Sequence, residues 1–372
     1  MHAMTPVLER GYTFWDRSIL PPDEFEDRTH QMQKALREDG LGAIVIWSQS
    51  YHSNGDLTYL SGWPMGGALV ITQEGDPAMF CVGGGREQYF ARMQTWLGDL
   101  RSFLSGLGKP IQETLVQRGV TAGKVGLVGL DQMPVNSHRN LTEALAGYEL
   151  IDYGATYQAR RSAKRPRELV AIGNSLRIAE AAVAGGEAVF AKGASNVEAL
   201  VEAERIARIL GARDFRALAN LSARGLRPFD GLPHARQSSL ALWVAVDQHA
   251  YWAEAANAGA GAMGTPARKA VDAMIAAATP GASADSIARA ALSVIPAEAA
   301  ADVLSYGLGS GIGLSRQETP LIEPGNVSQA VSEGLVLALR AYVPAGGKHG
   351  ASLATAMVCV GKHRLTLRGS AH

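Results

Sequence analysis

Apolar residues follow two different spacings along the first 160 or so positions. Between Glu24 and Glu38 they stand at helical intervals, and Gly40 follows as a stop. Three short apolar runs come next, each bounded by Gly, Pro, Asn or Asp, at 43–47, 67–71 and 78–82. Helical patterns at 109–118 and 138–145 then alternate with strand patterns at 124–128 and 149–152. This alternation predicts an α/β domain over residues 1–158.

A basic stretch from Arg160 to Pro166 breaks this pattern and is the expected linker, since proline suits the first turn of a new helix. A long alanine-rich helix is expected over 167–191. Ser195 and Glu198 form the S-x-x-E capping box of the helix after it. Strand patterns at 240–246, 335–342 and 353–360 accompany a helix pair within 266–304. We therefore predict an α+β domain over residues 159–372.

The charge balance and the apolar runs exclude several classes of protein. The chain has 35 basic and 35 acidic residues and no net charge, which argues against a nucleic-acid partner. No apolar run approaches the roughly 18 residues that span a bilayer. Charged residues occupy the N-terminal positions where a signal peptide would be apolar: Glu9, Arg10, Asp16 and Arg17. We expect a cytoplasmic protein without a membrane segment.

Several common catalytic signatures are absent from the sequence. There is no H-E-x-x-H, C-x-x-C, G-x-S-x-G or Walker A motif. Cys81 and Cys359 are the only cysteines, which leaves no thiolate cluster for zinc. The glycines of 307–313 recur at every second position, unlike the G-x-G-x-x-G of a dinucleotide turn. A nucleotide cofactor is therefore not expected.

The segment 306–320 reads Y-G-L-G-S-G-I-G-L-S-R-Q-E-T-P and is followed by Asn326 and by E-G-L-V at 333–336. It resembles the H-x-x-G-H-G-I-G-x-x-x-H-E-x-P … N … x-G-M-V pattern of the creatinase, aminopeptidase P and prolidase family (M24-like). Upstream, Y-L-S-G-W at 59–63 is similar to that family's Y-L-T-G-F, and R-S-A-K at 161–164 with Glu168 resembles its linker. The resemblance implies an α/β N-terminal domain of the creatinase type, an α+β pita-bread C-terminal domain and a homodimer.

The metal-dependent members of this family bind two divalent ions through two Asp, one His and two Glu. The resemblance places the following residues at these five positions: Trp243 and Glu254, Ser310, and Arg340 and Ala354. Four of the five ligands are thus replaced, and a guanidinium stands where a carboxylate should neutralise the metals. We predict neither a catalytic metal nor another cofactor. Gln317 also replaces the histidine of the family's H-E-x-P.

We expect these replacements to line one cavity: Trp243, Glu254, Ser310, Gln317, Arg340 and Ala354. Such a cavity would suit an organic ligand. Arg340 is suited to binding a substrate carboxylate through two hydrogen bonds, and Glu254, desolvated beside Trp243, is suited to acid or base catalysis. The alternative is that Glu254 and Arg340 form a buried ion pair that fills an abandoned metal site.

Creatinase works without a metal and uses a histidine as acid and base, so the resemblance raises the question of a histidine here. His234 is the candidate in the stretch before the first ligand strand, and His349 is a second candidate in the turn before the last strand. Each can equally be an exposed loop residue. Tyr306 stands where many members have a substrate-facing histidine, and its phenol has either a catalytic or a structural role.

These observations predict a metal-independent, creatinase-like enzyme that acts on a small carboxylate-bearing substrate. The simplest reaction is hydrolysis of a C–N bond. A lyase, cyclase or isomerase of small-molecule biosynthesis on the same site is an open alternative. A catalytically inactive pita-bread domain that binds a partner is another, because a shared fold does not by itself determine function.

Overall fold

The computed structural model describes residues 16–48, 55–103, 105–222, 225–257, 265–344, 351–362 and 365–367. The chain divides into two compact units, Met1–Arg161 and Ser162–His372. The first unit contains a six-stranded sheet, and the second contains a four-stranded and a five-stranded sheet. None of the described helices is long and apolar enough to cross a bilayer.

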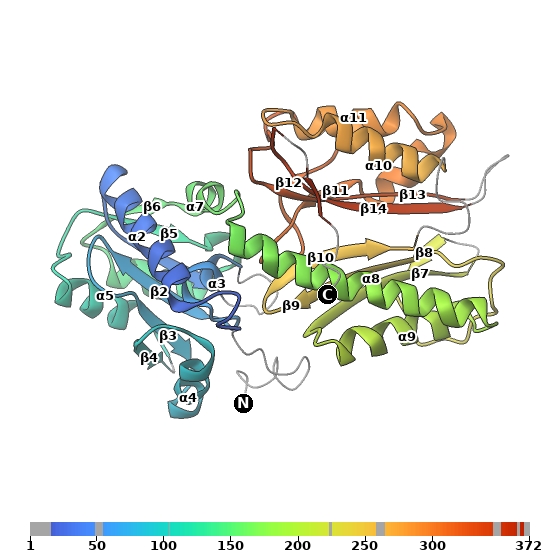
Figure 1. Ribbon diagram of the computed structural model, residues 1–372. Helices are drawn as coiled ribbons and strands as arrows, with labels where there is room; N and C mark the ends of the chain where they lie inside the picture. The colour runs from blue at the N-terminus through green and yellow to red at the C-terminus, as the bar shows by residue number, and fades with distance from the viewer. Residues whose placement is uncertain are drawn as a thin grey trace. The chain divides into compact units, whose positions relative to one another are not determined.

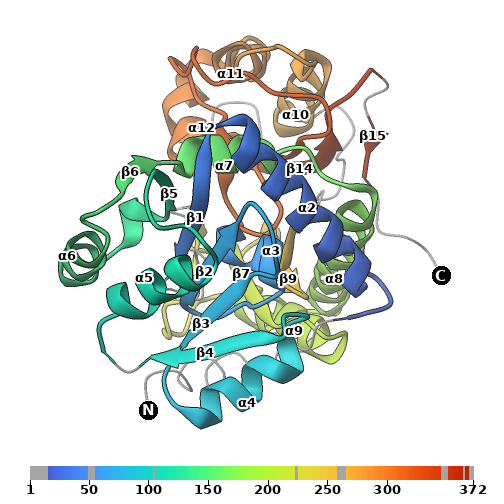
Figure 2. The same ribbon diagram turned by 90° about the vertical axis from the view of Figure 1, so that its left-hand side faces the viewer.

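The first unit is an α/β layer structure around a sheet of order β4-β3-β2-β1-β5-β6. Its strands are β1 (Leu41–Ser48), β2 (Gly67–Thr72), β3 (Ala78–Val82), β4 (Asp99–Phe103), β5 (Lys124–Val128) and β6 (Glu149–Asp152). Its helices are α2 (Pro22–Glu38), α3 (Gly55–Ser61), α4 (Gly85–Gln94), α5 (Gly108–Gln117), α6 (Val135–Ala144) and α7 (Gly154–Arg160). Figure 2 shows α5 and α6 on one face of the sheet and α2 and α3 on the other.

The amphipathic elements of this unit form as the sequence predicts. The helix expected from Glu24 is α2, and the three apolar runs are β1, β2 and β3. The sequence pattern does not predict α3, α4 or β4. All seven residues of α3 are buried, so this helix has no polar face and shows no helical periodicity.

The second unit stacks helices and sheets in four layers (Figure 1). Its helices are α8 (Pro166–Ala191), α9 (Asn196–Ile209), α10 (Pro266–Ala277), α11 (Ala284–Leu292) and α12 (Ala300–Tyr306). The four-stranded sheet comprises β7 (Asp214–Ser222), β8 (Gly225–Arg227), β9 (Leu242–Gln248) and β10 (Tyr251–Ala256). The five-stranded sheet comprises β11 (Gly309–Gly311), β12 (Glu318–Leu321), β13 (Val336–Val343), β14 (Ser352–Cys359) and β15 (Leu365–Thr366).

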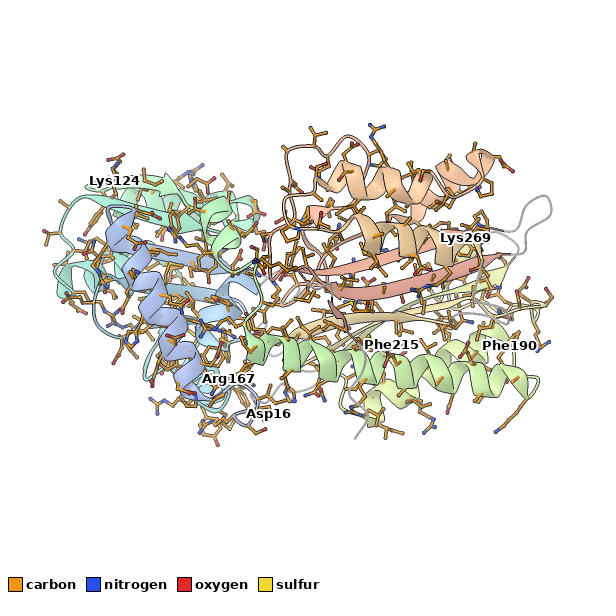
Figure 3. The ribbon with its side chains drawn as sticks, turned by 45° about the horizontal axis from the view of Figure 1, so that its top comes forward. Asp16, Lys124, Arg167, Phe190, Phe215 and Lys269 are labelled. Carbon is orange, nitrogen blue, oxygen red and sulfur yellow. The ribbon has the colours of Figure 1, made fainter. Side chains whose placement is uncertain are left out.

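Each sheet of the second unit has one face under helices and one face toward the other sheet. α8 and α9 cover the four-stranded sheet, and Phe215 of β7 lies on the side that α8 covers (Figure 3). α10 and α11 pack on Leu337, Leu339 and Ala341 of the five-stranded sheet. Strand β10 of the four-stranded sheet contacts strand β14 of the five-stranded sheet, so the two sheets pack against each other. Residues that alternate with the helix-covered positions therefore point into the space between the sheets.

The glycines of 307–313 are explained by close backbone packing. Gly309 has φ of +134°, and a Cβ there would overlap the carbonyl oxygen of Ala338 on β13. A Cβ at Gly311 would lie 2.5 Å from the carbonyl oxygen of Thr319. Only glycine allows β11 to lie this close to its neighbouring strands. The run is thus a structural feature of the sheet.

The predicted linker and helix pair need revision in detail. α7 includes Arg160 and α8 begins at Pro166, so the connection is shorter than the basic stretch. Instead of one helix pair, the region 266–306 contains α10, α11 and α12. The predicted capping box is present, with the Ser195 side chain accepting from the Glu198 N–H and Glu198 accepting from the Ser195 N–H. The S-x-x-E spacing therefore predicted the hydrogen bonds at the start of α9 correctly.

We expect Ser195→Ala to lower the free energy of unfolding by about 1 kcal/mol, because it leaves an N–H at the start of α9 without its cap. Urea denaturation measures this change. Val201→Ala is a matched control, since Val201 is 52% exposed on the same helix and its loss should change stability by less than about 0.5 kcal/mol. Equal effects of the two substitutions would contradict the capping role.

Candidate functional site

A buried ion pair joins the two sheets of the second unit. Glu254 on β10 accepts hydrogen bonds from Arg340 Nη1 on β13, which lies 3.0 Å from each carboxylate oxygen. The indole Nε1 of Trp243 on β9 donates to Glu254 Oε2 at 3.1 Å. The Glu254 side chain is 1% exposed and that of Arg340 is 18% exposed. The carboxylate is therefore shielded from water, while part of the guanidinium remains accessible.

Strand register brings these side chains together. Glu254 pairs with Ala245 and Ala256 pairs with Trp243, which puts Trp243 and Glu254 on one face of the four-stranded sheet. Arg340 alternates with Leu339 and Ala341, whose side chains pack under the helices, so it points the other way. The Arg340 guanidinium carbon lies 5.9 Å from the Trp243 ring centroid. Both donors to Glu254 thus come from residues that the sequence predicted to be neighbours.

Arg340 has donor capacity beyond this ion pair. Among the described residues, its Nη2 and Nε donate to no protein acceptor; the described hydrogen bonds of its side chain are those of Nη1 to Glu254. A Cβ added at Gly307 would lie 3.5 Å from Nη2, so the glycine leaves room beside that nitrogen. The free edge of the guanidinium can therefore receive an anion.

Arg316 is a third charged residue beside Glu254, and the sequence reasoning missed it. It lies in the turn between β11 and β12 and is half-buried. Burial lowers the pKa of Arg316; the carboxylate of Glu254 opposes this, and the positive charges of Arg340 and Arg216 add to it. The sequence signal was an arginine inside the glycine-rich motif, but its proximity to Glu254 depends on the folded turn.

The turn that carries Arg316 is held at both ends. Lys164 Nζ lies 2.8 Å from Glu318 Oε2, and these side chains are 1% and 8% exposed. The other carboxylate oxygen of Glu318 accepts the Ser315 N–H at 3.2 Å. The Trp252 N–H donates to the Gly313 carbonyl at 2.8 Å, which ties the turn to β10. The turn is therefore fixed two residues before Glu254 along that strand.

Two tyrosines extend the same row of side chains. Tyr342 stands two residues beyond Arg340 on β13, and its ring contacts that of Tyr306 edge to face, with 4.8 Å between centroids. Burial, and then the neighbouring Tyr306 and Asp302, raise the pKa of Tyr342 to about 12. A Cβ at Gly225 would come within 2.5 Å of the Tyr306 hydroxyl. Tyr306 thus lies near the site through its contact with Tyr342.

Of the three other residues predicted to line the cavity, Ser310 lies on its inner face, whereas Ala354 and Gln317 do not. Ser310 pairs with Ala338, so it shares the inner face with Arg340, and its hydroxyl donates to the Gly311 carbonyl at 2.9 Å. The placement of Ala354 in the cavity was wrong: Ala354 pairs with Ala341 and packs under the helices. Thr355 lies opposite Arg340 instead. Gln317 is exposed in the turn and does not join the buried cluster.

Of the two histidine candidates, only His234 lies within the described residues, and its described contact is with another residue of its own loop. His234 lies in the connection between β8 and β9, with Nε2 2.8 Å from Asp230 Oδ1. The hydrogen bond from His234 lowers the pKa of Asp230. This contact keeps the imidazole within its own loop. His349 lies outside the described residues.

The residues that the resemblance places at the metal-ligand positions do not fit a pair of divalent ions. They offer an indole, one carboxylate, a hydroxyl and a guanidinium, and the carboxylate of Glu254 already binds two donors. Within the described ranges there is no group of three or more His, Cys, Asp or Glu that could hold a metal ion. Divalent cations favour several oxygen ligands and would be repelled by Arg340. The arrangement is instead suited to an organic anion.

Comparison with family models identifies both units. Residues 28–162 match the creatinase/prolidase N-terminal domain, and residues 263–360 match metallopeptidase family M24. The chain therefore has a creatinase-type N-terminal domain and an M24 pita-bread domain. This confirms the resemblance and the fold class predicted from the motifs. Neither match includes Trp243 and Glu254, which lie between the two matched ranges.

Solved structures show the same fold along almost the whole M24-type chain. A prolidase from Pyrococcus horikoshii OT3 superposes with a TM-score of 0.73 at 17% identity, covering 93% of this chain and 99% of its own. An X-Pro aminopeptidase from Thermotoga maritima MSB8 has the same TM-score and identity, with 92% and 98% covered. The N-terminal domain of the FACT complex subunit SPT16 from chickpea (Cicer arietinum) has a TM-score of 0.62 at 14% identity, with 95% and 96% covered. The comparison with curated proteins found no match.

We expect Arg340→Ala to lower the free energy of unfolding by about 3–5 kcal/mol, because it leaves the buried Glu254 carboxylate without its countercharge. Chemical denaturation measures the loss. The matched control is Arg205→Ala, since Arg205 forms an exposed ion pair with Glu202 on α9 and should change stability little. The double variant Glu254→Gln with Arg340→Ala should recover part of the loss. A single variant as stable as the control would contradict the pairing.

The raised pKa of Tyr342 predicts a loss of stability at alkaline pH. The unfolded chain releases this proton near pH 10, whereas the folded chain holds it to about pH 12. The contribution of this phenol is therefore complete below about pH 10 and declines as the pH rises further, because the unfolded state then binds fewer protons. Denaturation of wild type and Tyr342→Phe across this range should show a smaller alkaline loss in the variant. Parallel profiles would contradict this cause.

Proposed function

We propose that this protein is a metal-independent, creatinase-like enzyme that acts on a small carboxylate-bearing molecule, most simply by hydrolysing a C–N bond. The observation that carries the proposal is the site at the metal-ligand positions, where one buried carboxylate lies beneath an accessible guanidinium. Hydrolases of the M24 family share the fold. The side chains, by contrast, are those of an anion-binding organic site.

In the proposed hydrolysis, Arg340 binds the substrate and Glu254 acts as the general base. Arg340 uses its free edge, Nη2 and Nε, to orient the substrate carboxylate. Water adds to the carbon of the C–N bond and gives a proton to Glu254, and the C–N bond then breaks. The leaving nitrogen takes a proton from the hydroxyl of Tyr306, which precedes Gly307 beside Arg340. The proton held by Glu254 returns to Tyr306 through water after the products leave, so both groups are restored. We assign the base role to Glu254 rather than to His234, because the described contact of His234 is with Asp230.

Two alternatives use the same structure differently. A lyase, cyclase or isomerase of small-molecule biosynthesis would need the same anion site and proton-transfer groups but would not activate water. A binding module without catalysis is the second alternative, because a shared fold does not by itself determine function. The homodimer and the cytoplasmic location stay predictions. Sedimentation analysis of the purified chain tests the first of these.

The reaction can be tested with a panel of guanidino acids, N-acyl amino acids and dipeptides at millimolar concentration. A substrate that binds the native state raises the midpoint of thermal unfolding. We expect turnover of such a compound in the presence of EDTA, no stimulation by Mn²⁺ or Zn²⁺, and ¹⁸O from labelled water in the product. Turnover without ¹⁸O would select the lyase, cyclase or isomerase. Activity that EDTA abolishes would contradict the metal-independent proposal.

A further inference from the structure

Tyr342 is a buried residue whose hydroxyl makes no hydrogen bond among the described residues. The side chain is 3% exposed, and its described contact is with the ring of Tyr306, at 4.8 Å between centroids. A buried tyrosine hydroxyl usually has a hydrogen-bond partner. The Tyr342 oxygen is not one of the fully enclosed polar atoms of the described chain that lack a partner, so it retains contact with solvent. A ligand can therefore reach this donor.

The contacts of the two rings place both phenol groups at Gly225 of β8. A Cβ at Gly225 would lie 2.5 Å from the Tyr306 hydroxyl and 3.4 Å from Cε1 of Tyr342, the ring carbon next to the one that bears the hydroxyl. Gly225 has φ of +85° and presents no side chain to the rings. The two phenols therefore converge on backbone, and no hydrogen bond between them is described.

The same phenols lie next to the accessible edge of Arg340. Tyr342 and Arg340 stand two residues apart on β13, so their side chains share one face of the sheet, with about 6.5–7 Å between them along the strand. Tyr306 directly precedes Gly307, where a Cβ would lie 3.5 Å from Arg340 Nη2. The guanidinium and the two phenols are thus connected along β13 and through Gly307. A ligand at the free edge of Arg340 is therefore beside a second hydrogen-bonding group.

The charges around Tyr342 favour an uncharged acceptor. Burial, and then Tyr306 and Asp302, raise the pKa of Tyr342 to about 12, so the phenol keeps its proton at neutral pH. The negative charge of Asp302 opposes a second anion at this position, and the positive charge of Arg340 opposes a cation. A carbonyl oxygen accepts from the phenol without either repulsion.

We propose that the Tyr342 hydroxyl donates a hydrogen bond to an uncharged carbonyl oxygen of the substrate, beside the carboxylate that Arg340 binds. This inference rests on the proposed function and adds a second recognition group to it. It restricts the substrate to molecules that carry both a carboxylate and a carbonyl-type acceptor. Tyr342 then determines specificity, because its donor stays unpaired when a carboxylate without that oxygen excludes water from the site.

Binding of matched acids tests the inference, with 4-oxopentanoate against pentanoate and 5-oxohexanoate against hexanoate as probes. The members of each pair differ by one carbonyl oxygen. At pH 7 we expect calorimetry to show that the oxo acid of at least one pair binds wild type about three- to tenfold more tightly than its partner, as expected for one hydrogen bond. Tyr342→Phe should remove this advantage and leave the binding of pentanoate and hexanoate unchanged. Tyr89→Phe is the control, since Tyr89 is 63% exposed on α4, and it should keep the advantage.

Thermal unfolding of the ligand-free protein separates this role from a structural one. Removal of a hydroxyl without a protein partner should leave the unfolding midpoint unchanged or raise it. Tyr157 gives the contrast, because its buried hydroxyl donates to the Asp56 carbonyl at 2.7 Å. Tyr157→Phe should therefore lower the midpoint. A midpoint for Tyr342→Phe as low as that of Tyr157→Phe would overturn the inference.

The outcomes distinguish this inference from the proposed function. An oxo-acid advantage that survives Tyr342→Phe, or that is absent from wild type, would overturn the role of Tyr342 and leave the proposed function standing. Equal weakening of the oxo and unsubstituted acids by Tyr342→Phe would also overturn it, since the hydroxyl would then not contact the carbonyl oxygen. Failure of every carboxylate to bind wild type would contradict both proposals.

Discussion

The need to pair one buried carboxylate organises the interior of the second unit. Glu254 is almost fully shielded from water, and a charge in that position is tolerated only with a countercharge and hydrogen bonds. Trp243 supplies a donor from the same sheet, and Arg340 supplies the countercharge from the opposite sheet. The two sheets are therefore joined by a polar contact at the centre of the unit as well as by apolar packing at its outer faces.

The second unit has the fold of its family, and its glycines are part of that fold. Gly309 and Gly311 are required because neighbouring carbonyl oxygens leave no space for a Cβ, and this requirement is independent of any reaction. Of the residues that the resemblance places at the metal-ligand positions, Trp243, Glu254, Ser310 and Arg340 point into the space between the sheets, whereas Ala354 packs under the helices. The likeness at 17% identity therefore extends to the fold, and a shared fold does not by itself determine the chemistry of the site.

Sequence patterns predicted the elements that have an amphipathic face or a local cap. The helix α2 and the capping box at Ser195 are of this kind, since their signals lie within a few residues. The buried α3 has no such pattern. The prediction for the last strand failed for another reason, because its register was wrong by one residue. Ala354 was assigned to the inner face, but Thr355 lies there. A shift of one residue reverses the direction of every side chain on a strand.

The sequence alone determined the family and the two-domain fold, because motif spacing carries that information directly, while the replacement of the metal ligands stays a prediction. It also predicted that Trp243, Glu254 and Arg340 would meet. Only the tertiary structure placed Arg316 beside them, kept His234 in its own loop with Asp230, and moved Ala354 under the helices. These outcomes depend on how separate strands and turns are aligned in space, and that alignment is the product of the whole fold rather than of any local pattern.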